Sequence, residues 1–257
     1  MLATTRYGPD PGDGATTPLM IAHGLFGSAR NWGVIARRLA ATRPVAAVDM
    51  RNHGQSPWTE THSYEDLAAD LAEAIDALGG RADVLGHSMG GKAAMALALT
   101  APQRVRKLVV ADIAPVAYGH SQRHLLNAMA QMDLSGLASR GEADARLAQA
   151  VETPAVRAFL LQSLDLKADP PCWRLNLATL DAEMDRILGW PGVDGRFDGP
   201  ALFLSGAASD YLRPEHRTPI RALFPAARFA KIPGAGHWLH AEKPREFEAT
   251  VAAFLDA

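Results

Sequence analysis

A serine between glycines, in the sequence Gly86-His87-Ser88-Met89-Gly90-Gly91, has the surroundings best suited to chemistry. An apolar run, Ala82-Asp83-Val84-Leu85, precedes this motif, and an alanine-rich amphipathic segment from Lys92 to about Leu99 follows it. The pattern predicts a strand, a sharp turn and a helix, in which glycines let strand and helix approach closely while the serine backbone is strained. We expect the turn to expose the Ser88 hydroxyl as a nucleophile and to aim the Met89 amide at an oxyanion.

A serine hydroxyl is a poor nucleophile at pH 7, so the sequence must also supply a base and an acid that holds the base in one tautomer. His237 is the predicted base, because it follows the last predicted strand in a Gly-Ala-Gly-His turn whose glycines let the loop return toward Ser88. His240, three residues further on, is expected to be a surface or capping histidine. The order serine, aspartate, histidine is the one expected for an α/β-hydrolase.

Two aspartates compete for the role of the acid. Asp112 ends the predicted strand after the Ser88 helix, and Asp210 follows the next predicted strand. Either carboxylate could reach His237 in a sheet of this order, so the spacing alone leaves both open.

The second oxyanion amide is expected in the loop His23-Gly24-Leu25-Phe26-Gly27-Ser28, which follows a predicted buried strand. We assign the donor to Leu25, with Phe26 as the alternative one residue later, and expect His23 to order the loop by hydrogen bonding. Phe26 and Trp238 are also our candidates for substrate binding. A second polar loop contains Asp49, Arg51 and His53, and we interpret it as pinned by its own hydrogen bonds, not as a metal or catalytic cluster.

These motifs require a scaffold of alternating strands and helices. Apolar runs at 18–23, 45–49, 82–85, 105–111, 200–206 and 228–232 predict strands, with helical patterns between them. The alternation predicts a mostly parallel sheet covered by helices on both faces, with 1–115 and 200–257 as one α/β core.

Residues 116–199 interrupt this rhythm. They show helical patterns at about 120–134, 141–151, 153–166 and 173–188 and no convincing strand, which predicts a helical cap over the strand ends. Six apolar cap residues are candidates for an acyl pocket, although each suits ordinary cap core as well: Leu125, Met129, Phe159, Leu160, Trp173 and Met184.

Composition narrows the function classes. The 257 residues carry a net charge of −2 and 48% apolar residues, and lysine and arginine form no basic block, so nucleic-acid binding is not supported. The single cysteine, Cys172, excludes an internal disulfide and is expected to be a small packed residue in a reducing compartment. No stretch has the length of a signal-peptide core or a membrane helix, so a cytoplasmic protein is expected. The histidines show no metal-ligand spacing, and no metal or cofactor is predicted.

The motifs HGLFGS, DMRNHGQSP, GHSMGGK, ADIAP and GAGHWLHAEKP, in this order, resemble the bacterial YbfF-type esterases and their mitochondrial abhydrolase-domain relatives. The resemblance covers nearly the whole chain and is weakest in the cap. It implies that Asp112, in the Asp-Ile-x-Pro motif, is the acid and that Ser209 joins the histidine's network. The sequence departs from the family at Gly206-Ala207-Ala208-Ser209, where Gly-Gly-Asn-Ser is usual, and in the extra carboxylate Asp210.

We therefore predict a serine esterase that hydrolyses short- to medium-chain acyl esters or thioesters through an acyl-enzyme, with a small-molecule ester as its partner. One alternative is a lyase or C–C bond hydrolase similar to the menaquinone-pathway synthase, whose acidic substrate calls for cap arginines facing the pocket. The candidates for that role are Arg123, Arg140, Arg146, Arg157 and Arg174. The other alternative is a non-catalytic binding module. The sequence sets neither the natural substrate nor the oligomeric state.

Overall fold

A computed structural model describes residues 1–9, 16–119 and 121–257, and its centre is a seven-stranded sheet in the order β1-β3-β2-β4-β5-β8-β9. The strands are β1 (Thr4–Tyr7), β2 (Leu19–Ala22), β3 (Val45–Val48), β4 (Ala82–His87), β5 (Val105–Ala111), β8 (Ala201–Gly206) and β9 (Ala227–Ile232). β1 runs antiparallel to β3, whereas the other neighbouring strands are parallel. The predicted mostly parallel sheet is confirmed. The sequence pattern missed β1 because its side chains are mostly exposed and form no apolar run.

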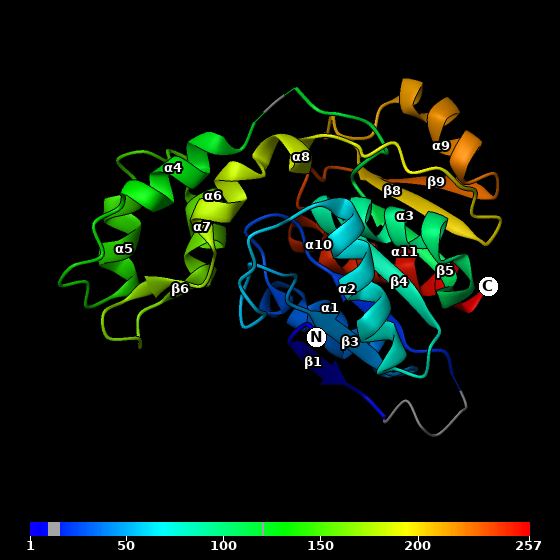
Figure 1. The fold of residues 1–257 in the computed structure, drawn as a ribbon, viewed down its shortest axis with the longest axis horizontal. Coiled ribbons are helices and arrows are strands. Elements are labelled where there is room, and N and C mark those ends of the chain that lie inside the picture. Colours follow the sequence, from blue (N-terminus) through cyan, green and yellow to red (C-terminus); the bar gives the residue numbers. More distant parts are fainter. Residues whose placement is uncertain (10–15, 120) are drawn as a thin grey trace.

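Helices cover both faces of the sheet (Figure 1). They are α1 (Gly33–Leu39), α2 (Tyr64–Asp76), α3 (Met89–Thr100), α9 (Arg217–Leu223), α10 (Leu239–Glu242) and α11 (Pro244–Asp256), with 3-10 turns at Ala29–Trp32, Pro102–Arg104 and Pro214–His216. Because side chains alternate along a strand, each face has its own apolar core. Met20 and Ala22 of β2 pack in the core that contains α2 and α3, whereas Leu19 and Ile21 pack in the core that contains α1 and α11.

The helix α2 shows how the local sequence sets an element. Ser63 caps its N-terminus, where the Ser63 Oγ accepts a hydrogen bond from the Asp66 amide at 3.1 Å. Leu67, Leu71 and Ile75 recur every four residues and are all fully buried. The apolar face of α2 therefore packs on the sheet and on α3, while its polar face remains in solvent.

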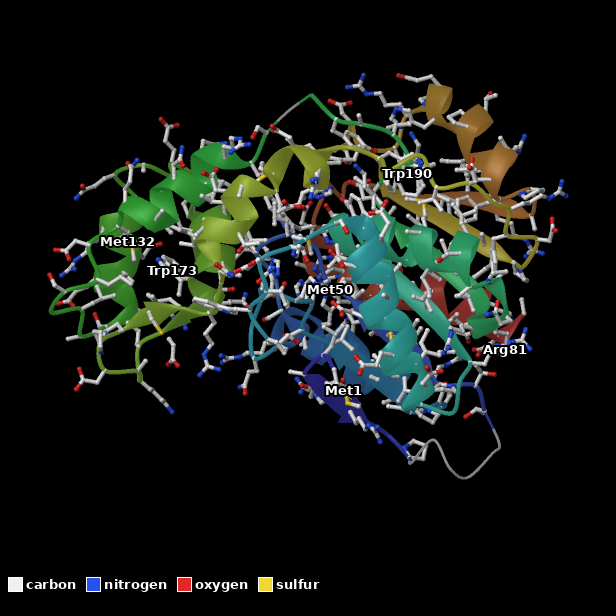
Figure 2. All side chains as sticks on the ribbon, in the orientation of Figure 1. Met1, Met50, Arg81, Met132, Trp173 and Trp190 are labelled. Atoms are coloured by element: carbon white, nitrogen blue, oxygen red, sulfur yellow. The ribbon has the colours of Figure 1, made fainter. Side chains whose placement is uncertain are left out.

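The segment between β5 and β8 forms a helical lobe beside the sheet (Figure 1). Its helices are α4 (Arg123–Gln131), α5 (Arg140–Leu147), α6 (Pro154–Leu160), α7 (Leu177–Ala182) and α8 (Met184–Leu188), and a 3-10 turn spans Leu161–Ser163. Figure 2 shows the labelled Trp173 within this lobe, where its indole Nε1–H donates to the Met129 carbonyl at 2.9 Å. Residue 120, where the first of these helices was predicted to begin, lies outside the described residues. Among the described residues, no helix is long and apolar enough to cross a membrane.

Two expectations for this segment were wrong. The helices predicted over 153–166 and 173–188 are present only in part, as α6, α7 and α8, and where no strand was expected β6 (Leu164–Asp165) and β7 (Cys172–Trp173) form a small antiparallel sheet. The Arg174 guanidinium pairs with Asp165 at 2.6 Å across this hairpin, a contact between distant residues that helical periodicity does not reveal. Cys172 was expected to be packed and is exposed on the hairpin instead.

The turn from β4 into α3 depends on glycines that touch neighbouring backbone. A Cβ at Gly90 would lie 2.5 Å from the Ala22 carbonyl oxygen and 2.4 Å from that of His23. A Cβ at Gly86 would lie 2.2 Å from the Gly90 carbonyl oxygen. Since backbone atoms of the central sheet cannot move aside, glycine at these positions brings α3 against the end of β2.

We predict that Gly90→Ala lowers the free energy of unfolding by about 2–3 kcal/mol, the upper part of the usual range for overpacking, because the new methyl meets two carbonyl oxygens. Urea unfolding followed by circular dichroism measures the change. Gly141→Ala, at an exposed position of α5 where a Cβ meets its nearest atom at 3.9 Å, is the control and should stabilise slightly. A Gly90→Ala protein as stable as wild type would contradict the steric argument.

Candidate active site

Ser88 sits at the sharp turn between β4 and α3. Its backbone has φ 53° and ψ −119°, in the left-handed range that non-glycine residues rarely adopt. The Ser88 amide donates to the Ala111 carbonyl of β5 at 3.0 Å, which holds this conformation. The strained turn presents the serine side chain to the pocket above the sheet.

A chain of hydrogen bonds links three predicted site residues. The Ser88 Oγ lies 3.2 Å from the His237 Nε2, and the His237 Nδ1 lies 2.7 Å from the Asp112 Oδ2. Because the Asp112 carboxylate accepts from Nδ1–H, the lone pair of the neutral ring is on Nε2 and faces the serine hydroxyl. This arrangement can take a proton from Ser88 and stabilise the resulting imidazolium.

Asp112 is fully buried at the end of β5. Besides His237, its carboxylate accepts hydrogen bonds from the Gly206 amide at 3.2 Å and from the Ser209 hydroxyl. Three donors compensate for the loss of hydration of the buried carboxylate. Ser209 thus contacts the Asp112 carboxylate itself, while its link to His237 is indirect.

Asp210, the alternative acid, is exposed to solvent. Its main-chain carbonyl accepts from the Arg213 Nε at 3.0 Å. Among the described residues, no hydrogen bond or ion pair joins the Asp210 carboxylate to His237. The loop after β8 therefore directs Ser209 toward the site and the next side chain away from it.

The two predicted oxyanion donors lie on separate segments that both line the pocket. Among the described residues, neither the Leu25 amide nor the Met89 amide donates a hydrogen bond to a protein group. The Phe26 amide, considered as the alternative donor, instead donates to the His53 Nε2 at 3.1 Å. The contacts thus leave Leu25 and Met89 available to a bound oxygen.

Several buried histidines surround this site. Burial lowers the pKa of His23 to about 4, that of His53 to about 3 and that of His62 to about 2. The pKa of His87 is also lowered well below its ordinary value by burial. These rings are therefore neutral at pH 7 and act as hydrogen-bonding and packing groups. The interpretation of Asp49, Arg51 and His53 as a self-pinned loop agrees with its contacts, since Asp49 accepts from the Ala29 and Gln55 amides.

The surroundings of His237 correct one expectation and add a residue that the sequence did not reveal. His240 was expected at the surface, but it is buried and stacks on Trp32 with ring centroids 4.2 Å apart. The turn into α10 points it inward, and burial lowers its pKa to about 3. Tyr211 stacks on the His237 ring, with centroids 3.8 Å apart and an interplanar angle of 18°. The sequence signal that could have revealed Tyr211 is its position directly after Ser209 and Asp210.

The pocket above Ser88 has an empty volume of about 770 Å³, part of it open to solvent. Both candidates for substrate binding, Phe26 and Trp238, line it. Of the six candidates from 116–199, Leu125 and Phe159 line it, whereas the other four belong to the buried hydrophobic core: Met129, Leu160, Trp173 and Met184. Among the described residues, no group of histidine, cysteine, aspartate or glutamate side chains has the arrangement of a metal site.

Lys92 is an unexpected member of the pocket wall. It lies one helical turn after Ser88 and is buried, with its ammonium 4.9 Å from the Tyr118 ring centroid and 5.6 Å from that of Tyr64. The Lys92 Nζ donates to the Leu188 carbonyl at 2.9 Å and to the Gly189 carbonyl. Burial lowers its pKa to about 7. Its position in the Ser88 helix was the one sequence signal of this role.

Comparison with known proteins identifies the family of this fold. The family described as the alpha/beta hydrolase fold matches residues 17–244. Esterase YbfF of Escherichia coli (strain K12) is 41% identical over 246 residues, which cover 93% of each chain. The sn-1-specific diacylglycerol lipase ABHD11 of Mus musculus is 40% identical over 253 residues, covering 95% of this chain and 82% of that protein. A solved structure, a marine microorganism esterase, is 37% identical, has a TM-score of 0.92 and covers 98% of each chain.

The parallel sheet, the strained serine at a strand-to-helix turn and the helical insertion define the class of α/β proteins with a serine at the end of the central strand. The chain belongs to the alpha/beta hydrolase fold family. The resemblance to YbfF-type esterases and their abhydrolase-domain relatives is also confirmed.

We predict that Asp112→Asn lowers kcat on an ester substrate by about 10³- to 10⁴-fold, because the amide favours the wrong His237 tautomer, as in other serine triads. Steady-state kinetics measures the loss. Asp210→Asn, a matched change in the neighbouring exposed carboxylate, should be nearly silent. The reverse ranking of the two variants would show that Asp210 is the acid.

Because of the buried histidines, we predict that the free energy of unfolding depends on pH. Their folded pKa values lie below the ordinary value of 6.5, so as pH falls below about 6.5 the unfolded chain binds protons that the folded chain does not. The free energy of unfolding therefore falls between pH 7 and pH 5, by about 2 kcal/mol for each such histidine.

His240→Phe, which keeps an aromatic ring beside Trp32, should reduce this loss by about 2 kcal/mol. Urea unfolding at pH 7 and pH 5 measures the difference. The control, His124→Phe at an exposed position of α4, should lose as much stability as wild type. An unchanged loss in His240→Phe would contradict the prediction.

Proposed function

We propose that this protein is a serine esterase that hydrolyses short- to medium-chain acyl esters or thioesters through an acyl-enzyme. The observation that carries the proposal is the hydrogen-bonded chain from Ser88 through His237 to Asp112. Beside it lie the Leu25 and Met89 amides, which have no hydrogen-bond acceptor within the part of the chain that the structure describes. Support comes from relatives along almost the whole chain that are named esterase or lipase. In this proposal, residues 116–199 act as a cap over a core formed by 1–115 and 200–257.

The reaction uses groups of the chain and water. His237 accepts the hydroxyl proton as Ser88 Oγ attacks the ester carbonyl, and Asp112 stabilises the imidazolium. The amides of Leu25 and Met89 bind the oxyanion, each worth roughly 3 kcal/mol of the barrier. His237 then gives its proton to the departing alcohol or thiol. A water molecule then attacks the acyl-enzyme carbonyl while His237 takes its proton, and His237 returns this proton to the Ser88 Oγ as the acyl–Oγ bond breaks and the acid leaves.

The pocket supports an acyl substrate of modest length. Its walls are mostly apolar, with Leu125 and Phe159 from the helical segment and Trp238 beside the histidine. The Tyr64, Lys92 and Tyr118 side chains bound it on the side of the Ser88 helix. An apolar chain gains by leaving water in such a site, and the clustered rings limit its length.

The lyase or C–C hydrolase alternative required arginines that face the pocket. None of the five candidates lines it, since each binds an acidic side chain or a carbonyl within the helical segment: Arg123, Arg140, Arg146, Arg157 and Arg174. A non-catalytic binding module would not need the complete relay of nucleophile, base and acid. The contacts therefore favour the esterase over both alternatives.

Hydrolysis of p-nitrophenyl acetate, butyrate, octanoate and palmitate by the purified protein tests the proposal. We expect turnover of the shorter esters and little of the palmitate, with turnover lost in Ser88→Ala because the nucleophile is absent. A fluorophosphonate should label the wild type and not this variant. The Asp210→Asn variant is the control for effects of expression and purification, and its ester turnover and fluorophosphonate labelling should match those of wild type.

Two results would overturn the proposal of a serine esterase. One is turnover of all four esters no greater than that of Ser88→Ala, which would favour the lyase or binding alternatives. The other is fluorophosphonate labelling that persists in Ser88→Ala, which would place the reactive residue elsewhere.

A further inference from the structure

Two buried histidines from one loop contact the two separate segments of the oxyanion site. The loop connects β3 to α2 and contains His53 and His62. The His53 ring contacts the Leu25–Phe26 segment that follows β2, and the His62 ring contacts Met89 at the start of α3. Their ring centroids are 5.5 Å apart. Neither ring lines the pocket, so neither has a place in the proton transfers proposed above.

His53 fixes the first segment through a defined tautomer. Its Nδ1 lies 2.9 Å from the Arg51 carbonyl oxygen, so this nitrogen carries the proton and donates. The Nε2 lone pair then accepts the Phe26 amide at 3.1 Å. Phe26 has φ 63°, in the left-handed range, and its carbonyl accepts from the Ser163 hydroxyl at 3.0 Å. Phe26, the residue after Leu25, is thus held through both its amide and its carbonyl in a strained conformation.

His62 fixes the second segment through the opposite tautomer. The Asn52 Oδ1 accepts the Thr59 amide at 2.8 Å, which leaves the Asn52 Nδ2–H group to donate to the His62 Nδ1 at 3.3 Å. The His62 Nε2 therefore carries the proton and donates to the Met89 Sδ at 3.2 Å. Methionine is unbranched and has three rotatable bonds, so this contact restricts a side chain that would otherwise be mobile.

A third histidine ties the loop to the sheet. The His23 Nε2 accepts the Met50 amide at 2.9 Å, its Nδ1–H donates to the Gly24 carbonyl at 2.8 Å, and its ring lies 5.0 Å from that of His53. All six ring nitrogens of the three histidines therefore have protein partners, which excludes a shared metal at this cluster. The cluster acts through the positions of the groups that it holds.

We propose that His53 and His62 are positioning residues that set the relative placement of the Leu25 and Met89 amides. The inference rests on the proposed function, because the two amides matter only if they bind an oxyanion. An oxyanion donor acts at full strength only when it lies at hydrogen-bond distance from the transition-state oxygen, so a small displacement affects kcat more than KM. The two histidines hold different amides, and their effects should multiply.

The test compares replacements that remove or keep the key hydrogen bond. In His62→Leu the donor to Met89 is lost at similar volume, whereas the Gln side chain of His62→Gln keeps an N–H near the ring Nε2. In His53→Leu the Phe26 amide loses its acceptor, whereas His53→Gln keeps an oxygen there. We expect each Leu variant to lower kcat by about tenfold with KM within about twofold, and the double Leu variant by about 100-fold, since complete loss of one donor costs 10²–10³.

A second readout isolates the oxyanion site. The Ki of a trifluoromethyl ketone, which forms a tetrahedral adduct with Ser88, should rise in each Leu variant by the factor by which kcat/KM falls. Both Gln variants should recover most of kcat and Ki. Phe224→Leu, in the distant core between α9 and the sheet, is the control for lost stability and should retain kcat although it lowers the unfolding temperature.

The outcomes separate this inference from the esterase itself. If wild type shows no Ser88-dependent hydrolysis, the proposed function fails. If wild type is active and the Leu variants keep kcat within twofold, the positioning role alone is wrong. Equal losses of kcat in the Leu and Gln variants would also overturn the positioning role. So would a loss of kcat in Phe224→Leu that accompanies its lower unfolding temperature.

Discussion

The left-handed backbone of Ser88 is the constraint on which the arrangement around the site depends. With φ at 53°, the chain must turn from β4 into α3 within one residue, and this is possible only because Gly86 and Gly90 carry no side chains between strand and helix. The same close approach brings α3 against the end of β2. One constraint therefore exposes the serine and places the Met89 amide beside the loop that carries Leu25.

Burial sets the charge state of the ionisable groups around Ser88. Asp112 is a fully buried carboxylate, and such a charge is costly unless donors replace its hydration. Gly206, Ser209 and His237 supply three donors. The other nearby histidines are kept neutral by burial, so they do not compete with His237 for its acidic partner. The Asp112 carboxylate is thus compensated by hydrogen-bond donors, and His237 is the ring that contacts both Asp112 and Ser88.

The sequence predicted the parts of the molecule that short-range patterns determine. The strand-turn-helix at Ser88, the sheet class and the loop after β2 all follow from local motifs. The spacing left Asp112 and Asp210 both open as the acid, because the choice depends on which side chain of the loop after β8 turns inward, and only the family resemblance implied Asp112. The β6–β7 hairpin and the inward position of His240 depend on contacts between distant residues, Asp165 with Arg174 and His240 with Trp32. Periodicity carries no information about such contacts.

Lys92 links the helix that carries Ser88 to the helical segment between β5 and β8. It lies one turn after Ser88 on α3, and its ammonium binds two carbonyls at the end of α8, where a cation is favoured by the exposed carbonyl groups of a helix C-terminus. The Tyr64 hydroxyl donates to the preceding carbonyl, that of Ile187, at 2.6 Å. The end of the helical segment is therefore fixed to the helix that carries the serine. Because the pocket wall and the serine share this attachment, a movement of α8 must change the shape of the pocket at the residues nearest the Ser88 helix.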